Sequence, residues 1–253
     1  MTQQTIALIT GGNRGLGRAT ALKLAEAGTD VVLTYRSNEA EAVEVVDAVI
    51  ALGRKAVALR LDTTSLDTFP AFTADLRTAL DTTWGRETFD HLVNNAGVAA
   101  YTPVGRTTVE AFDLLVDVHF KGVVFLTQEL LPLLADGGRI VNLSTGLARF
   151  ASEGFSVYGA VKSAVDTYSR YLAKELGGRG ISVNTVAPGP IATDFGGGAV
   201  RDDQEINAHW AGNAALGRVG LPDDIGAAIA ALLSPGTGWI TGQRIEASGG
   251  TLI

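Results

Sequence analysis

The chain has 253 residues, no cysteine and a formal net charge of −7, and 46% of its residues are hydrophobic. This length and apolar content suit one α/β domain and argue against disorder, while the absence of cysteine excludes disulfides, thiolate nucleophiles and sulfur-ligated metals. The acidic charge argues against general nucleic-acid binding, because a phosphate backbone attracts a positive protein surface.

The N-terminal segment does not resemble a targeting sequence, because residues 1–4 lack the basic start and the apolar run of a signal peptide. No later segment has the roughly 18 uninterrupted apolar residues of a membrane helix. The three histidines, His91, His119 and His209, show no metal-ligand spacing. We therefore expect a cytoplasmic protein that binds no metal, membrane or nucleic acid.

Short apolar runs, typical of strands buried on both faces, alternate with longer amphipathic stretches along the chain. The predicted strands are 5–10, 30–35, 55–60, 89–94, 139–143, 181–186 and 243–246. The predicted helices are 16–27, 39–52, 67–83, 109–134, 155–177 and 222–232. This alternation predicts a single doubly wound, Rossmann-type α/β domain over residues 1–253, with a parallel sheet of about seven strands and helices on both faces.

One long connection interrupts this rhythm near the C-terminus. Residues 194–221 carry three consecutive glycines, Gly196 to Gly198, and then an acidic run. The segment follows the sixth predicted strand, and ligands bind at the carboxyl ends of the strands in such sheets. We expect it to form a substrate lid, with a variable surface excursion as the alternative.

A glycine-rich turn joins the first predicted strand to the first predicted helix. It reads Thr10-Gly11-Gly12-Asn13-Arg14-Gly15-Leu16-Gly17. Glycines let the backbone approach a pyrophosphate, and the following helix N-terminus offers unpaired N–H groups and a positive dipole end. A glycine cluster alone is weak evidence, but strand, turn and helix in this order predict a dinucleotide site.

The end of the second predicted strand indicates which dinucleotide binds. An NAD site usually has an acidic residue there, which accepts from the ribose 2′-hydroxyl. This strand instead ends in Tyr35, Arg36 and Ser37. Arg36, with Arg14 of the glycine turn as a second cation, would pair with a 2′-phosphate. The pattern favours NADP(H) over NAD(H), and the alternative is that both arginines point into water.

Two residues of the helix predicted at 155–177 suit proton transfer. Tyr158 and Lys162 are four residues apart, so their side chains lie on one face of the helix. A free tyrosine has a pKa of about 10, and a neighbouring ammonium favours the phenolate and lowers that pKa. The pair alone is weak evidence, because it also occurs by chance.

The fourth, fifth and sixth predicted strands end in residues that suit a cofactor and a substrate. Small residues after the fourth let the backbone pass close to a cofactor, and hydroxyls after the fifth can donate to a substrate oxygen that gains negative charge. The rigid and then polar segment after the sixth suits a nicotinamide carboxamide. These residues are Asn95, Ala96 and Gly97, then Ser144 and Thr145, then Pro188, Gly189, Ile191 and Thr193.

Over nearly its whole length the chain resembles the short-chain dehydrogenase/reductase family. The matching signatures are Thr10-Gly11-x-x-x-Gly15-x-Gly17, Asn94-Asn95-Ala96-Gly97, Tyr158-x-x-x-Lys162, Pro188-Gly189, and Ile240-Thr241-Gly242-Gln243 with Gly249-Gly250. The overall pattern is most similar to 3-oxoacyl-carrier-protein reductases and small carbonyl reductases.

The resemblance implies an oxidoreductase that transfers a hydride between NADP(H) and a ketone or secondary alcohol. It implies that Tyr158 is the general acid/base, that Lys162 lowers the pKa of Tyr158 and binds the nicotinamide ribose, and that Thr193 holds the carboxamide. The cofactor-binding residues expected are Gly11, Asn13, Arg14, Gly15, Leu16, Gly17, Tyr35, Arg36, Ser37, Asp62, Thr63, Asn95, Ala96, Gly97, Tyr158, Lys162, Pro188, Gly189, Ile191 and Thr193. Because the family is commonly tetrameric, we expect a homo-oligomer, a tetramer or a dimer.

Two positions depart from the family pattern. The family's catalytic serine normally lies thirteen residues before the tyrosine, where this chain has Thr145, and Ser144 lies one residue earlier. Because neighbouring side chains of a strand point to opposite faces, we expect Thr145 to be the donor and Ser144 to support the structure. His119 stands where the family usually has an asparagine, whose main-chain carbonyl is thought to hold a water in a proton relay. A histidine can keep that carbonyl in place, or it can simply be a packed helix residue.

Two other functions fit part of the pattern. A non-catalytic NADP-binding sensor or scaffold would not need Tyr158 and Lys162 together, and an NAD-dependent alcohol dehydrogenase would not need Arg36. The sequence does not identify the substrate. It predicts an apolar pocket, whose candidate lining residues are Val98, Leu147, Phe150, Phe155 and Phe195.

Overall fold

The computed structural model describes residues 4–253, whose apolar runs form one parallel sheet. Over these residues the strand order is β3-β2-β1-β4-β5-β6-β7. The strands are β1 (Ile6–Ile9), β2 (Asp30–Tyr35), β3 (Ala56–Arg60), β4 (Phe89–Asn94), β5 (Leu134–Leu143), β6 (Ser182–Pro188) and β7 (Arg244–Ala247). The predicted doubly wound α/β fold is therefore confirmed.

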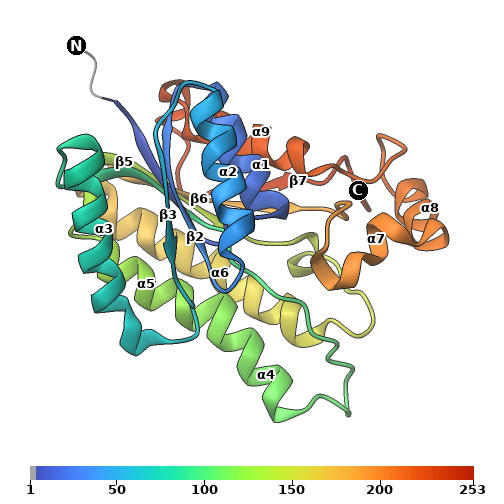
Figure 1. Ribbon diagram of the computed structural model, residues 1–253. Helices are drawn as coiled ribbons and strands as arrows, with labels where there is room; N and C mark the ends of the chain where they lie inside the picture. Colours follow the sequence, from blue (N-terminus) through green and yellow to red (C-terminus); the bar gives the residue numbers. More distant parts are fainter. Residues whose placement is uncertain (1–3) are drawn as a thin grey trace.

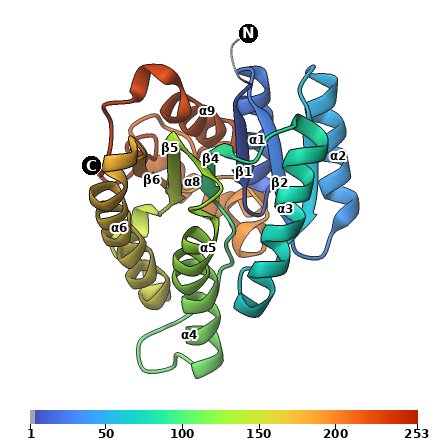
Figure 2. The same cartoon turned by 90° about the vertical axis from the view of Figure 1, so that its left-hand side faces the viewer.

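Helices cover both faces of the sheet (Figures 1 and 2). They are α1 (Gly15–Glu26), α2 (Glu39–Ala51), α3 (Phe69–Trp84), α4 (Val109–Val116), α5 (Gly122–Leu130), α6 (Ser156–Leu176), α7 (Ala199–Asp202), α8 (Gln204–Gly212) and α9 (Pro222–Leu233). One apolar cluster packs α3, α5 and α6 against the sheet, and a second packs α1, α2 and α9 against its other face. No helix among residues 4–253 is both long enough and apolar enough to cross a membrane.

The one long helix predicted at 109–134 is divided in the structure. α4 runs into a π-helical turn at Asp117–Lys121, where the Gly122 N–H donates to the Asp117 carbonyl, and α5 then ends at Leu130. Pro132, which has no N–H to continue a helix, follows two residues later. Leu134 already pairs with Phe89 in the sheet, so the last part of the prediction is wrong.

The predicted lid segment is not a simple loop. It contains a short 3-10 turn at Phe195–Gly198 and the helices α7 and α8. Gly196, Gly197 and Gly198 have φ values of 64°, 77° and 81°, a left-handed conformation that few other residues adopt. The segment is tied back to the C-terminus by a bridge between Ala214 and Thr251.

Strand pairing brings the carboxyl ends of the central strands to one edge of the sheet. Asn94 at the end of β4 pairs with Asn142 near the end of β5, and Leu143 pairs with Val186 near the end of β6. The glycine turn follows β1 at the same edge, because Ile9 pairs with Val93. The polar residues that follow these strands therefore lie along one edge of the sheet.

Candidate active site

A cavity of about 950 Å³ lies along this edge. The predicted site residues that line it are Gly11, Asn13, Arg14, Gly15, Leu16, Arg36, Ser37, Asp62, Thr63, Asn95, Ala96, Gly97, His119, Ser144, Thr145, Tyr158, Lys162, Pro188, Gly189, Ile191 and Thr193. Gly17 and Tyr35 lie outside the lining. The Tyr35 side chain instead packs against the second apolar cluster.

The glycine turn has the shape that a pyrophosphate requires. Gly11 and Gly15 have φ values of 62° and 53°, and Arg14 leaves the first N–H groups of α1 without a side-chain cap. A Cβ on Gly17 would lie 2.2 Å from the Gly11 carbonyl oxygen and 2.6 Å from Nδ2 of Asn95. Gly17 therefore acts by allowing close packing of the turn, which explains why it does not line the cavity.

Asn95 fixes the turn to the end of β4. Its Nδ2 donates to the carbonyl oxygens of Thr10 at 2.9 Å and of Gly11 at 3.0 Å. In return, the Thr10 hydroxyl accepts from the backbone N–H groups of Asn95 and Ala96, both at 3.0 Å. The sequence predicts Asn95 as a cofactor contact, and the structure gives it this second, structural task.

Two cations are available where the second strand ends. Arg14 and Arg36 are exposed and line the cavity, and neither pairs with a carboxylate within residues 4–253. Asn13 is engaged, since its Nδ2 donates to Oε2 of Glu41 at 2.6 Å. Glu41, which sequence reasoning missed, also lines the cavity. These two guanidinium groups and the uncapped N-terminus of α1 fit a dinucleotide that carries an extra phosphate.

Tyr158 and Lys162 lie one turn apart on α6, and both are buried, with exposed fractions of 8% and 4%. The Nζ of Lys162 donates to the Leu143 carbonyl at 2.7 Å and lies 6.0 Å from the centroid of the Tyr158 ring. Burial lowers the pKa of Lys162 to about 8, although the nearby Asp166 carboxylate opposes this shift. At neutral pH the ammonium therefore keeps its charge.

Burial also acts on Tyr158, in the opposite direction. It raises the pKa of Tyr158 above its ordinary value, and a hydrogen bond with the Thr145 hydroxyl opposes this rise. The sequence predicts that Lys162 lowers this pKa, but in this structure burial outweighs any lowering. Tyr158 is therefore protonated at neutral pH, which is the state that a proton donor needs.

The two candidate hydroxyls follow β5 in an extended backbone. Thr145 has φ −161° and ψ 151°, and its Oγ1 accepts from the Leu147 N–H at 3.3 Å, which leaves the O–H free to donate. The Ser144 hydroxyl is buried and has no hydrogen-bond partner among the described residues. Both residues line the cavity, but it is the Thr145 hydroxyl that opposes the rise in the pKa of Tyr158. This effect favours Thr145 as the donor.

His119 lies in the π-helical turn between α4 and α5 and is 1% exposed. Its Nε2 lies 2.7 Å from the Val98 carbonyl oxygen and 3.3 Å from the Val98 backbone nitrogen, and its Nδ1 is buried without a hydrogen-bond partner among the described residues. Burial first, and then the charge of Lys162, lower the pKa of His119 well below its usual range. Its ring meets the Tyr158 ring edge-on at 5.2 Å. His119 is thus a neutral side chain that packs against Tyr158 and holds the loop after β4.

Apolar and aromatic side chains line the part of the cavity next to Tyr158. Val98, Leu147, Phe150, Phe155 and Phe195 line it as predicted, and Ile206 and Trp210 of α8 join them. Ring centroids are 6.3 Å apart for Phe150 and Trp210 and 5.9 Å apart for Tyr158 and Phe195. The sequence analysis missed Ile206 and Trp210, although their spacing of four residues is a helical signal within the lid segment.

Comparisons with known proteins show what the chain is similar to. A family model described as enoyl-(acyl carrier protein) reductase matches residues 11–251. A hydroxynaphthalene reductase-like protein of Metarhizium brunneum is 34% identical, over 98% of this chain and 94% of that protein.

Two solved structures extend the likeness to the whole fold. LugOII, described as a promiscuous reductase that catalyses keto-reduction at C1 during lugdunomycin biosynthesis, has a TM-score of 0.93 and 37% identity over 100% of both chains. The angucycline C-6 ketoreductase LanV with bound NADP has a TM-score of 0.92 and 36% identity, over 98% of this chain and 95% of its own.

The choice between the two hydroxyls can be tested by deleting each. Thr145→Val keeps the β-branched shape and removes the donor, so kcat on a reducible ketone should fall by roughly 10²–10³, as for other donors to a developing oxyanion. Ser144→Ala should be milder, and Thr145→Ser should stay active. If Ser144→Ala is the inactive variant while Thr145→Val turns over normally, Ser144 is the donor.

Proposed function

Because the chain belongs to the short-chain dehydrogenase/reductase family, we propose that it is an NADPH-dependent carbonyl reductase. The observation that carries this proposal is the meeting of Tyr158, Lys162 and Thr145 in the same cavity as the glycine turn. A sensor or scaffold has no use for a buried ammonium beside a buried phenol, because burying a charge is unfavourable unless something is gained by it.

The reaction is the reduction of a ketone to a secondary alcohol. NADPH, when bound, supplies the hydride that adds to the carbonyl carbon. Tyr158 donates its phenolic proton to the carbonyl oxygen, and the Thr145 hydroxyl donates a hydrogen bond to that oxygen as its charge grows. The ammonium of Lys162 stabilises the phenolate that Tyr158 becomes, until Tyr158 takes a proton from solvent.

The cofactor residues divide by the part of the dinucleotide they hold. The glycine turn and the N-terminus of α1 hold the pyrophosphate, and Arg14 and Arg36 hold the 2′-phosphate. Asp62 and Thr63 contact the adenine, and the segment from Pro188 to Thr193 holds the carboxamide. The likeness to LanV, whose structure has bound NADP, supports NADP(H) as the dinucleotide.

The aromatic wall supports a flat ketone with fused rings as the substrate. Phe150, Phe155, Phe195 and Trp210 offer ring faces and edges, which bind aromatic ligands by stacking and edge contacts. The hydroxynaphthalene reductase-like relative also takes its name from a fused-ring compound.

Residues 194–221 act as the lid, because α8 contributes Trp210 to the wall and the glycines at 196–198 form a hinge. A homotetramer and a cytoplasmic location stay predictions.

The substrate class is tested with a panel that contains 2-tetralone and a linear 3-oxoacyl thioester. Wild-type protein should oxidise NADPH with the bicyclic ketone in preference to the linear one.

The proton donor is tested with Tyr158→Phe on the same panel. Tyr158→Phe removes one oxygen with little change in volume, so folding and NADPH binding should survive while kcat falls by ~10²–10⁴. Near wild-type turnover in this variant would mean that the proton comes from elsewhere.

The cofactor preference is tested with Arg36→Asp, which replaces attraction of the 2′-phosphate by repulsion. Charge-assisted hydrogen bonds contribute about 1.5–3 kcal/mol, so kcat/KM for NADPH should fall at least about tenfold relative to NADH. Arg18→Asp, on the exposed side of α1 and outside the cavity lining, is the matched control. An unchanged ratio of the two cofactors would contradict the assignment.

A further inference from the structure

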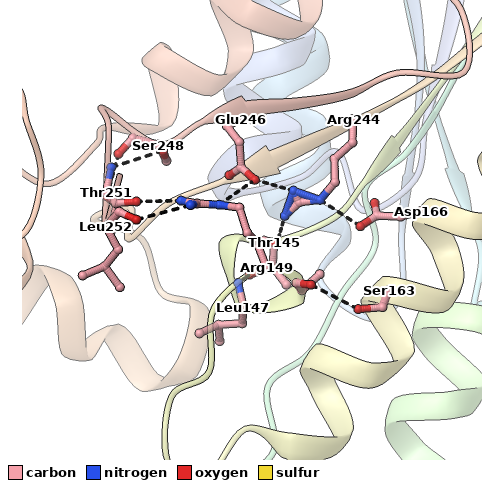
Figure 3. Close-up of polar contacts among 11 residues, drawn as sticks. Thr145, Leu147, Arg149, Ser163, Asp166, Arg244, Glu246, Ser248, Thr251 and Leu252 are labelled. Atoms are coloured by element: carbon pink, nitrogen blue, oxygen red, sulfur yellow. Dashed lines mark hydrogen bonds and ion pairs between the residues drawn. The ribbon is translucent and has the colours of Figure 1, made fainter.

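Arg244, the first residue of β7, lies behind the candidate catalytic residues and does not line the cavity. Its Nη2 donates to the main-chain carbonyl of Thr145 at 2.7 Å, and its Nε donates to Oδ2 of Asp166 at 2.9 Å. Its Nη1 pairs with Glu246 on the same strand. Figure 3 shows this guanidinium between the β5–α6 connection, α6 and β7. One side chain thus connects three elements.

The two acceptors of Arg244 belong to the two halves of the site. The Thr145 carbonyl also accepts from the Ala148 N–H at 3.1 Å, so it opens the short helical turn that follows the candidate donor. Asp166 is one turn beyond Lys162 on α6, the helix that also carries Tyr158. The guanidinium therefore fixes the distance between the hydroxyl-bearing loop and the helix of the proton donor.

The geometry and burial of this contact favour a rigid link. The side chains of Arg244 and Asp166 are 21% and 9% exposed, so water screens their attraction weakly. A guanidinium presents donors in a planar fork, which can hold two acceptors in fixed directions, whereas an ammonium is a point charge. The second oxygen of Asp166, Oδ1, has no partner within the described part of the chain. Arg244 is the cation that pairs directly with Asp166.

A second chain of contacts holds the far end of the same connection. Arg149 lies 3.2 Å from the same Glu246 oxygen, and its Nη2 donates to the Thr251 carbonyl at 2.8 Å. The network in Figure 3 therefore reaches from the C-terminal segment to the loop that carries Thr145. Within this network, Arg244 supplies the side chain that donates to the backbone carbonyl of Thr145.

We propose that Arg244 and Asp166 are positioning residues, which hold the Thr145 loop against α6 so that the hydroxyl of Thr145 reaches the oxygen that Tyr158 protonates. The inference rests on the proposed carbonyl reductase activity. A misplacement of about 1 Å in such a site can reduce turnover on the order of 10²-fold, although the displaced residue never touches the substrate.

Asp166 has a second effect, because its charge acts on Lys162. The charged and titratable groups that face Lys162 are Tyr158 and Asp166 on α6 and neutral His119 from the π-helical turn, and Arg244 of β7 pairs with Asp166. Burial lowers the pKa of Lys162 to about 8, and Asp166 opposes that lowering. Without the carboxylate charge, Lys162 should lose its proton at a lower pH, and turnover that depends on its charge should fall earlier as pH rises.

The test compares Arg244→Lys and Asp166→Asn with wild type, using the full chain, NADPH and a ketone that wild type reduces. Arg244→Lys keeps the charge but cannot hold both acceptors, so kcat should fall by roughly 10–100-fold with the KM for NADPH unchanged. Asp166→Asn should move the alkaline limb of the kcat profile to lower pH, which loss of packing alone would not do.

Arg54→Lys is the matched control for the loss of a buried arginine pair. Arg54 Nε lies 2.8 Å from Oδ1 of Asp30, with side chains 22% and 0% exposed, and neither residue lines the cavity. This variant should keep the wild-type kcat whatever its melting temperature. The inference is overturned if Arg244→Lys lowers kcat no more than Arg54→Lys, or if Asp166→Asn keeps the wild-type alkaline limb. Absence of wild-type turnover on every ketone would instead contradict the proposed function.

Discussion

Lys162 holds an ammonium group where its side chain is only 4% exposed. Burying a charge is unfavourable, and here it is offset by the Leu143 carbonyl at 2.7 Å and by the charge of Asp166. Burial alone would leave Tyr158 a protonated phenol that resists losing its proton. In the proposed reaction, the cation beside it makes the loss possible, because it stabilises the phenolate. The proposed chemistry of the cavity therefore depends on this one charge.

The fold supplies the rigidity that such an arrangement needs. Three buried polar side chains connect the strand ends to the helix of Tyr158 and Lys162. The Nδ2 of Asn94 donates to Oδ1 of Asn142 at 2.8 Å, and Nδ2 of Asn142 donates to the Ser169 hydroxyl at 2.8 Å. A satisfied buried network of this kind fixes β4, β5 and α6 relative to one another. Arg244 extends the same fixation to the loop after β5.

The sheet could be predicted because strands buried on both faces leave few alternatives, and β2 and β4 have the predicted bounds. The division of the helix predicted at 109–134 could not be predicted, since the π-helical turn at Asp117–Lys121 contains no glycine or proline that would mark a break in the sequence. Motifs located most of the candidate site, because its residues follow strands or share a helix turn. Arg244 and Asp166 gave no signal, as 78 residues separate them and only folding brings them together.

The central claim is that the charge of Lys162 makes proton donation by Tyr158 possible, and the pH dependence of kcat for ketone reduction tests it most directly. With saturating NADPH, turnover should be constant at neutral pH and should fall as pH rises through about 8, where the pKa of Lys162 lies. The lysine amine is charged below its pKa and neutral above it, so the loss of turnover must occur on the alkaline side. Turnover that stays constant up to about pH 10, where free tyrosine titrates, would contradict the account.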